Sequence, residues 1–192
     1  MDDKEEKLNE EIYHIKRAKK DIKDFDYLYR KYYPKINNYV YHRVYEDSIR
    51  QEIVSNVFFK AMKKLHMFTI FENKRSSFSA WLFRIAMSEL NQYFRDRKRD
   101  TRIGNKVRWN YLPDDEDDIP ERVKIKFEPI RQKMQDLNQE EQDLLTLRFF
   151  EKMRYKEIAQ VYKKKETAIK VRIHRIMKKL RQSLEGEYNE DI

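Results

Sequence analysis

The chain has 192 residues and a formal net charge of +9, with 43 Lys or Arg against 34 Asp or Glu. It contains no cysteine, which excludes disulfides, thiolate metal sites and cysteine nucleophiles, and its four histidines are far apart in sequence, so we expect no metal and no cofactor. The basic balance favours a polyanionic partner, and nucleic acid before a membrane.

The sequence also indicates a compartment. No apolar run approaches the roughly 18 residues that a membrane span needs, so we expect no membrane insertion. The first ten residues, MDDKEEKLNE, are charged, unlike a secretory signal peptide. We therefore expect a cytoplasmic protein.

Apolar residues recur at helical spacing through most of the chain, and only two glycines and four prolines interrupt it, which predicts an all-α fold. A thin apolar stripe marks an N-terminal helical extension over 1–24. We expect this extension to pack on the next domain rather than to dock an inhibitor. Wider stripes follow over 25–40 and 53–65, and a loop is predicted at about 66–77.

The next predicted helix, over 78–99, follows a Ser-Ser pair that can cap it and is apolar around most of its circumference. At 100° per residue, its remaining polar residues share one seam. The seam consists of Arg84, Ser88, Asn91, Arg95 and Lys98. Cations, amides and hydroxyls in a row suit an unpaired nucleic-acid strand, which needs partners for phosphates and base edges. We interpret the nearby Trp81, Phe83 and Phe94 as core residues rather than stacking platforms.

Residues 101–128 differ in composition from their neighbours. They include one glycine, two prolines and the acidic run DDEDD at 114–118. A segment of this kind cannot bury a core, so it predicts an acidic flexible linker. The chain is thus divided into two small helical domains, 25–100 and 129–185, with a tail at 186–192.

The second domain carries a helix-turn-helix pattern over 155–181. A short helix at 156–161, a polar break and a longer helix follow one another, and residues 151–181 hold twelve Lys or Arg against three Glu, a net charge of +9. One face of the longer helix is apolar and the other can offer donors to a DNA major groove. The expected DNA-contacting residues are Thr167, Lys170, Val171, His174, Arg175, Lys178 and Lys179. A solvated amphipathic helix with a basic face is the plainer alternative.

The expected roles within this face differ by position. Arg175 is the best candidate for a bidentate guanine contact, worth about 1–3 kcal/mol of discrimination. Thr167 and Lys170 lie near the helix start, where contacts to bases or phosphates usually fall. Lys178 and Lys179 are expected to hold phosphates, which position the helix without specifying sequence.

Five stretches, taken in order, carry a resemblance to a known family. The first domain contributes FDYLYRKYYPKINNYV, IRQEIVSNVFFKAMKKL and FSAWLFRIAMSELNQYFRDRKR. The second contributes LNQEEQDLLTLRFFEKMRYKEIAQVY and TAIKVRIHRIMKKLR. Together they resemble bacterial RNA polymerase sigma factors of the extracytoplasmic-function (ECF) group, in the sigma-70 family. The resemblance spans roughly residues 25–100 and 129–185.

The resemblance implies a sigma factor, not an enzyme, that binds core RNA polymerase and directs it to promoter DNA. It implies that the helix-turn-helix binds the −35 duplex, and that the 66–77 loop and the seam trap the melted −10 strand. It assigns core polymerase contacts to Glu52, Ser55, Asn56 and Phe59. An anti-sigma factor is a candidate further partner, because many members of the family have one.

Two departures from the family pattern stand out. The usual Asp-x-x-Gln-Glu of the polymerase-binding surface is Glu52-x-x-Ser55-Asn56 in this chain. Lys163 and Lys164 stand where the turn usually carries glycine and an apolar residue. A non-glycine residue in a left-handed turn costs about 1 kcal/mol or more, so a reshaped turn is expected. The alternative function is a stand-alone helix-turn-helix transcriptional regulator, which would have no need of the seam.

Overall fold

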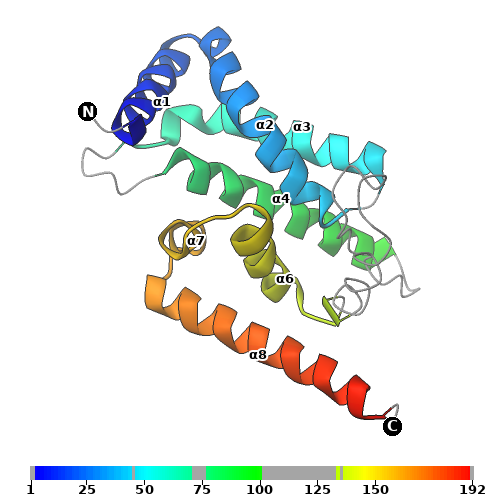
Figure 1. Cartoon of the computed structure of the whole chain (residues 1–192). Helices are drawn as coiled ribbons and strands as arrows, with labels where there is room; N and C mark the ends of the chain where they lie inside the picture. The colour runs from blue at the N-terminus through cyan, green and yellow to red at the C-terminus, as the bar shows by residue number, and fades with distance from the viewer. Residues whose placement is uncertain (1–2, 45, 71–76, 101–132, 135, 191–192) are drawn as a thin grey trace, which may run out of the picture.

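A computed structural model describes residues 3–44, 46–70, 77–100, 133–134 and 136–190. Within these ranges the chain is helical and forms no strand, which confirms the predicted all-α class (Figure 1). The elements in chain order are α1 (Asp3–Lys20), η1 (Ile22–Phe25), α2 (Asp26–Tyr41), α3 (Asp47–Lys64), η2 (Leu65–Met67), α4 (Phe78–Asp100), α6 (Gln139–Leu145), the π-helical turn η4 (Thr146–Phe150), α7 (Tyr155–Tyr162) and α8 (Glu166–Glu190).

The first domain is built on α2, α3 and α4, each of which packs against the other two. These helices form because their apolar residues recur at three- and four-residue steps and so share one side. The side chains that fill this core include Leu28, Ile36, Val57, Phe58, Leu82, Ala86 and Leu90. Helix α4 starts after Ser77, whose Oγ accepts from the Ala80 N–H at 3.3 Å, so the Ser-Ser pair does supply a cap.

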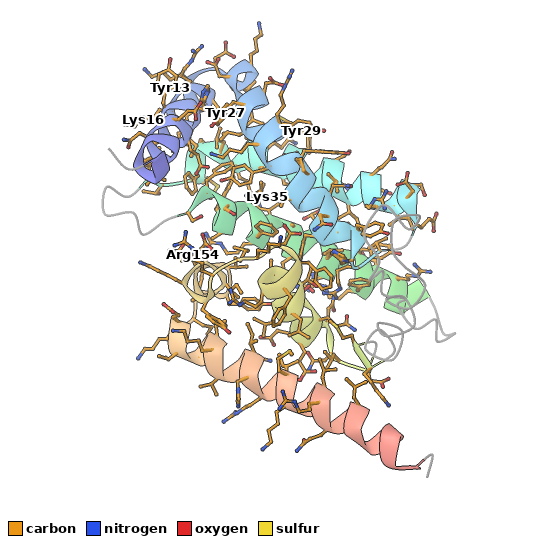
Figure 2. The ribbon with its side chains drawn as sticks, viewed as in Figure 1. Tyr13, Lys16, Tyr27, Tyr29, Lys35 and Arg154 are labelled. Carbon is orange, nitrogen blue, oxygen red and sulfur yellow. The ribbon has the colours of Figure 1, made fainter. Side chains whose placement is uncertain are left out.

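The N-terminal extension packs on this domain through α1. Ile15 is buried, the His14 ring stacks on Tyr27 with centroids 3.8 Å apart, and the Tyr32 hydroxyl donates to Glu11 at 2.6 Å (Figure 2 labels Tyr27). Only part of the predicted stripe is used in this way, because Ile22 remains 47% exposed.

The second domain begins with a capping box at α6. The Asn138 side chain accepts from the Glu141 N–H at 3.0 Å, and the Glu141 carboxylate accepts from the Asn138 N–H at the same distance. The π-helical turn and α7 follow, and α8 then crosses beneath α6 and α7 in the view of Figure 1. Helix α8 continues to Glu190, so the predicted tail at 186–192 is helical over most of its length.

The two domains are not separate bodies. Their buried side chains form one continuous core, in which α4 packs against α7 and α2 packs against the π-helical turn. Figure 1 shows α4 lying between α2 and α3 on one side and α6 and α7 on the other. The predicted linker, 101–128, and the middle of the predicted loop, 71–76, lie outside the described residues.

Candidate nucleic-acid and polymerase interfaces

Helix α8 divides into a buried stripe and an exposed basic face. The stripe consists of Ile169, Ile173, Ile176 and Leu180, none more than 7% exposed. All seven residues expected to contact duplex DNA are exposed, and Val171 reaches 50%. The buried and exposed faces of α8 are therefore those predicted from the spacing of its apolar residues. Burial of the isoleucines leaves the opposite, basic face in solvent.

The cations of α8 differ in how firmly they are held. Lys170 forms an ion pair with Glu166 at 2.8 Å, and Lys179 lies 3.7 Å from Glu141 on α6. Arg175 and Lys178, by contrast, make no hydrogen bond or ion pair with the part of the chain that the structure describes. These two side chains are therefore free to reach a ligand without breaking a contact.

A groove runs between α6 and α8 beside this face. One residue of α6 and seven of α8 line it. They are Glu141, Thr167, Ala168, Val171, Arg172, Arg175, Ile176 and Lys179. Arg172 does not face the groove freely, because its guanidinium pairs with Glu140 at 2.5 Å. The buried stripe holds α8 on its domain, since ion pairs as exposed as these contribute only about 0–1 kcal/mol each.

The turn between α7 and α8 keeps the left-handed geometry. Lys163 ends α7 at φ 53° and ψ 41°, and the Lys164 N–H donates to the Ala159 carbonyl at 3.0 Å. The expectation of a reshaped turn is wrong at this point. The hydrogen bonds that close the helix outweigh the cost of about 1 kcal/mol for placing a lysine in this region.

The α4 seam is less open than the α8 face. Ser88 and Arg95 are exposed, whereas Arg84 and Asn91 are partly buried, and Arg95 donates to Gln92 at 2.7 Å. The side chain of Lys98 lies outside the described residues. Of the three aromatic residues interpreted as core, Phe83 is buried, and Trp81 and Phe94 are partly buried against the core.

The residues assigned to core polymerase share the outer face of α3. Glu52, Ser55, Asn56 and Phe59 are all exposed, opposite a buried stripe that includes Val57. Phe59 is 51% exposed, and the Lys63 ammonium lies 4.4 Å from its ring centroid. This exposure leaves the Phe59 ring accessible to a partner, although singly exposed apolar residues are common on protein surfaces.

A groove beside this face, between α3 and α4, is mainly acidic. It is lined by Glu46, Ile49, Glu52, Ile53, Asn56, Glu89, Gln92, Tyr93, Asp96 and Arg97. Lys60 at its edge pairs with Glu89 at 2.6 Å. The other carboxylates of this groove add to the charge of Glu52 and partly offset the charge lost at Asn56, where the family pattern has a glutamate.

One set of residues escaped the sequence analysis. Tyr39 of α2 and Arg43, which follows that helix, meet Asp143 of α6 inside the protein, and Asn38 of α2 meets Glu151 after the π-helical turn. Burial raises the pKa of Asp143, although the Arg43 charge opposes this, and burial raises the pKa of Glu151 to about 7. Nothing in the sequence signals these contacts, because their partners are about 100 residues apart.

Two negative findings apply to the residues that the structure describes. Those residues contain no group of three or more His, Cys, Asp or Glu side chains placed to hold a metal ion. No helix among them is both long enough and apolar enough to cross a membrane.

Comparison with known families matches both domains. A model of sigma-70 region 2 matches residues 28–100, and a model of sigma-70 region 4 matches residues 134–182, together more than half of the chain. RNA polymerase sigma factor YlaC of Bacillus subtilis (strain 168) is 28% identical over 166 residues, which cover 85% of this chain and 94% of YlaC. The ECF RNA polymerase sigma factor BldN of Streptomyces coelicolor is 26% identical over 81% of this chain and 58% of BldN.

Solved structures share the fold. CnrH, determined with the cytosolic domain of CnrY, aligns with a TM-score of 0.62 at 16% identity, over 91% of this chain and 96% of CnrH. The sigma factor RpoE from Bartonella quintana, determined with the anti-sigma factor NepR, aligns with a TM-score of 0.65 at 19% identity, over 85% of this chain and 98% of RpoE. Because the models of sigma-70 regions 2 and 4 match in order and the curated relatives are sigma factors, this protein belongs to the sigma-70 family as a sigma factor of the ECF group that directs promoter-specific transcription.

Proposed function

We propose that this sigma factor recognises a −35 duplex with α8 and traps the melted −10 strand along the α4 seam. The observation that carries the proposal is the basic face of α8, which is exposed along its predicted length opposite a buried apolar stripe. A major groove is wide enough for one α-helix, and an exposed row of cations and small side chains is what such a helix needs.

The contacts within α8 divide by reach and freedom. Arg175, which has no partner in the described part of the chain, donates to a guanine edge. Lys178 and Lys179 hold phosphates near the middle of the helix. Thr167 and Lys170 contact the DNA near the N-terminus of α8. Lys170 must break its ion pair with Glu166 to reach a phosphate or a base. Val171 and His174 lie between these groups on the same exposed face.

The −10 strand is assigned to α4. Arg84, Arg95 and Lys98 supply charge for phosphates, while Ser88 and Asn91 supply hydrogen bonds for base edges. Exposure of Ser88 and Arg95 supports this assignment. The chain has no nucleotide-binding loop of the G-x-x-x-x-G-K-[ST] type, so strand opening must draw on binding energy.

Core RNA polymerase is assigned to the outer face of α3, where Glu52, Ser55 and Asn56 precede the exposed Phe59 on the same side of the helix. Aromatic residues, phenylalanine included, are enriched at protein interfaces. A partner of the anti-sigma type stays a prediction from the family; the sigma factor RpoE, which shares the fold, was solved with the anti-sigma factor NepR.

Run-off transcription tests this function. The purified chain, added to bacterial core RNA polymerase on genomic fragments, should produce transcripts with defined start sites, and neither component alone should do so. A Phe59→Ala chain should need a higher concentration to give the same yield. Tight specific binding of the isolated chain to duplex DNA, with no stimulation of core polymerase, would favour the stand-alone regulator instead.

A further inference from the structure

The outer side of α1 carries two cations and an aromatic ring that the proposed function does not use. Counted at 100° per residue, Tyr13, Lys16 and Lys20 fall within about 60° of one another and away from the buried Ile15. All three are exposed, Tyr13 to 54%. Figure 2 shows Tyr13 and Lys16 on this helix. These three residues are called the α1 face below.

The two lysines of the α1 face are not neutralised by neighbouring carboxylates. Neither Lys16 nor Lys20 forms a hydrogen bond or an ion pair with any residue in the described ranges of the chain. Residues 16–23 hold five Lys or Arg against one Asp, a local net charge of +4. The α1 face is therefore complementary to a polyanion, which it can bind without first breaking a contact of its own.

The ring of Tyr13 is exposed but supported by its neighbours. The Arg17 guanidinium donates to the Tyr13 hydroxyl at 3.3 Å, and it also donates to the Asp24 carboxylate at 2.8 and 3.1 Å. The His14 ring stands edge-on to the Tyr13 ring, with centroids 5.3 Å apart. A supported ring loses less side-chain entropy when a ligand stacks on it. Cations beside an exposed aromatic ring are typical of surfaces that bind single-stranded nucleic acid.

The α1 face is linked to the surface assigned to the −10 strand. Lys19 of α1 donates from Nζ to the Phe68 carbonyl, and α1 packs against η2. The Phe68 and Trp81 ring centroids lie 5.3 Å apart, and Trp81 precedes Arg84 of the seam by three residues, about one helical turn. Direct contacts through Phe68 and Trp81 thus connect α1 with the start of the seam.

We propose that the α1 face is a second binding surface for the melted strand, with Lys16 and Lys20 on phosphates and one base stacked on Tyr13. The inference rests on the proposed function of the α4 seam, because it extends the path of the strand from that seam past Phe68 onto α1. A single strand suits this face better than a duplex does, since paired bases are stacked on one another and offer no free ring to Tyr13.

Binding of a labelled oligothymidine of about 24 nucleotides to the full chain tests the α1 face. An excess of unlabelled duplex of about 20 base pairs occupies the basic face of α8 during the titration. Lys16→Gln with Lys20→Gln should weaken strand binding roughly tenfold. The slope of log K against log salt should fall by about 1.4, because each phosphate contact on a single strand contributes about 0.7. A separate titration with labelled duplex should show no change.

Three further variants control for charge, for structure and for stacking. Arg30→Gln with Lys35→Gln removes the same charge from exposed positions of α2 and should leave the strand affinity within about twofold. Lys16→Arg with Lys20→Arg keeps the charge and should keep both the affinity and the salt slope. Tyr13→Ala should weaken strand binding roughly fivefold or more, whereas Tyr13→Phe, which keeps the ring, should retain most of the affinity.

The possible results separate this inference from the proposed function. Strand affinity that falls with Arg84→Ala and Asn91→Ala, but not with the glutamine changes in α1, overturns the inference and leaves the proposed function standing. Strand affinity that responds to neither pair overturns both. A loss of affinity for core RNA polymerase in the glutamine variant, with strand affinity and salt slope unchanged, would make the α1 face a protein contact and would also overturn the inference.

Discussion

The two helices assigned to promoter DNA differ in how they are presented. Helix α8 lies at the edge of the molecule with its whole basic face in solvent, whereas α4 is enclosed by other helices and leaves only a seam, half of whose described residues are partly buried. A duplex is rigid and wide and needs an open convex surface, while a single strand can follow a narrow one. The difference in exposure thus matches a difference in ligand.

The comparison also predicts separable effects. The α8 face is exposed, whereas the α4 seam is only partly so. Changes that act on only one of the two helices should therefore affect duplex binding and strand capture separately.

The largest effect is expected from Arg84→Ala combined with Asn91→Ala. Loss of two polar contacts, one of them charged, should weaken open-complex formation by about 10- to 100-fold, because no other group replaces them. Binding of the −35 duplex should be nearly unchanged. Permanganate footprinting of the melted region and a duplex gel-shift assay measure the two properties, and an equal loss in both would break the division between α4 and α8.

A change of pH should act on the packing between the two domains. Burial raises the pKa of Glu151 from 4.5 to about 7, against the opposing effects of Asn38, which donates to it, and of Lys35, which lies on α2 in Figure 2. A raised carboxyl pKa contributes stability that is complete below pH 4.5 and is lost as pH rises to about 7. The free energy of unfolding should therefore fall across this window, on the order of 2 kcal/mol after allowance for partial exposure of Glu151.

Thermal unfolding of the chain, recorded across this pH range, measures the effect. Glu151→Gln should flatten the profile, since the amide still accepts from Asn38 and cannot ionise. The control Glu10→Gln changes an exposed carboxylate on α1 and should leave the profile as it was. A profile of Glu151→Gln that matches the profile of the unmodified chain would contradict the prediction.

Within α8, Arg175→Ala and Lys179→Ala should behave differently. Loss of Arg175 should relax preference at one base pair by about 1–3 kcal/mol, because a bidentate guanine contact carries sequence information. Loss of Lys179 should weaken binding to all sequences alike and reduce the slope of log K against log salt by about 1. Titrations against a duplex library at two salt concentrations distinguish them, and identical behaviour would mean that the assigned face of α8 is rotated.

The smallest expected effect is a gain in stability from Lys163→Gly. Lys163 adopts a left-handed conformation that glycine accepts without cost, so the variant should be more stable by about 1 kcal/mol or somewhat less. Thermal unfolding measures this difference. Lys164→Gly is the control, since Lys164 does not have a positive φ, and it should give no gain.

Local patterns in the sequence were enough for the parts of the site that lie on one helix. The three- and four-residue steps of Ile169, Ile173 and Ile176 determine which face of α8 is buried, so the basic face follows from the sequence alone. The Ser-Ser pair before residue 78 likewise predicted a helix cap, which Ser77 supplies. In each case the physical cause acts over no more than two helical turns.

What only the tertiary structure decided lies between helices. The sequence shows Tyr39, Arg43 and Asp143 as ordinary members of two helices, and it cannot show that they meet, because pairing across about 100 residues depends on how whole domains dock. The periodicity of a helix depends on residues that are neighbours in the sequence. The burial of a charge beside its partner depends on how the helices pack into one core.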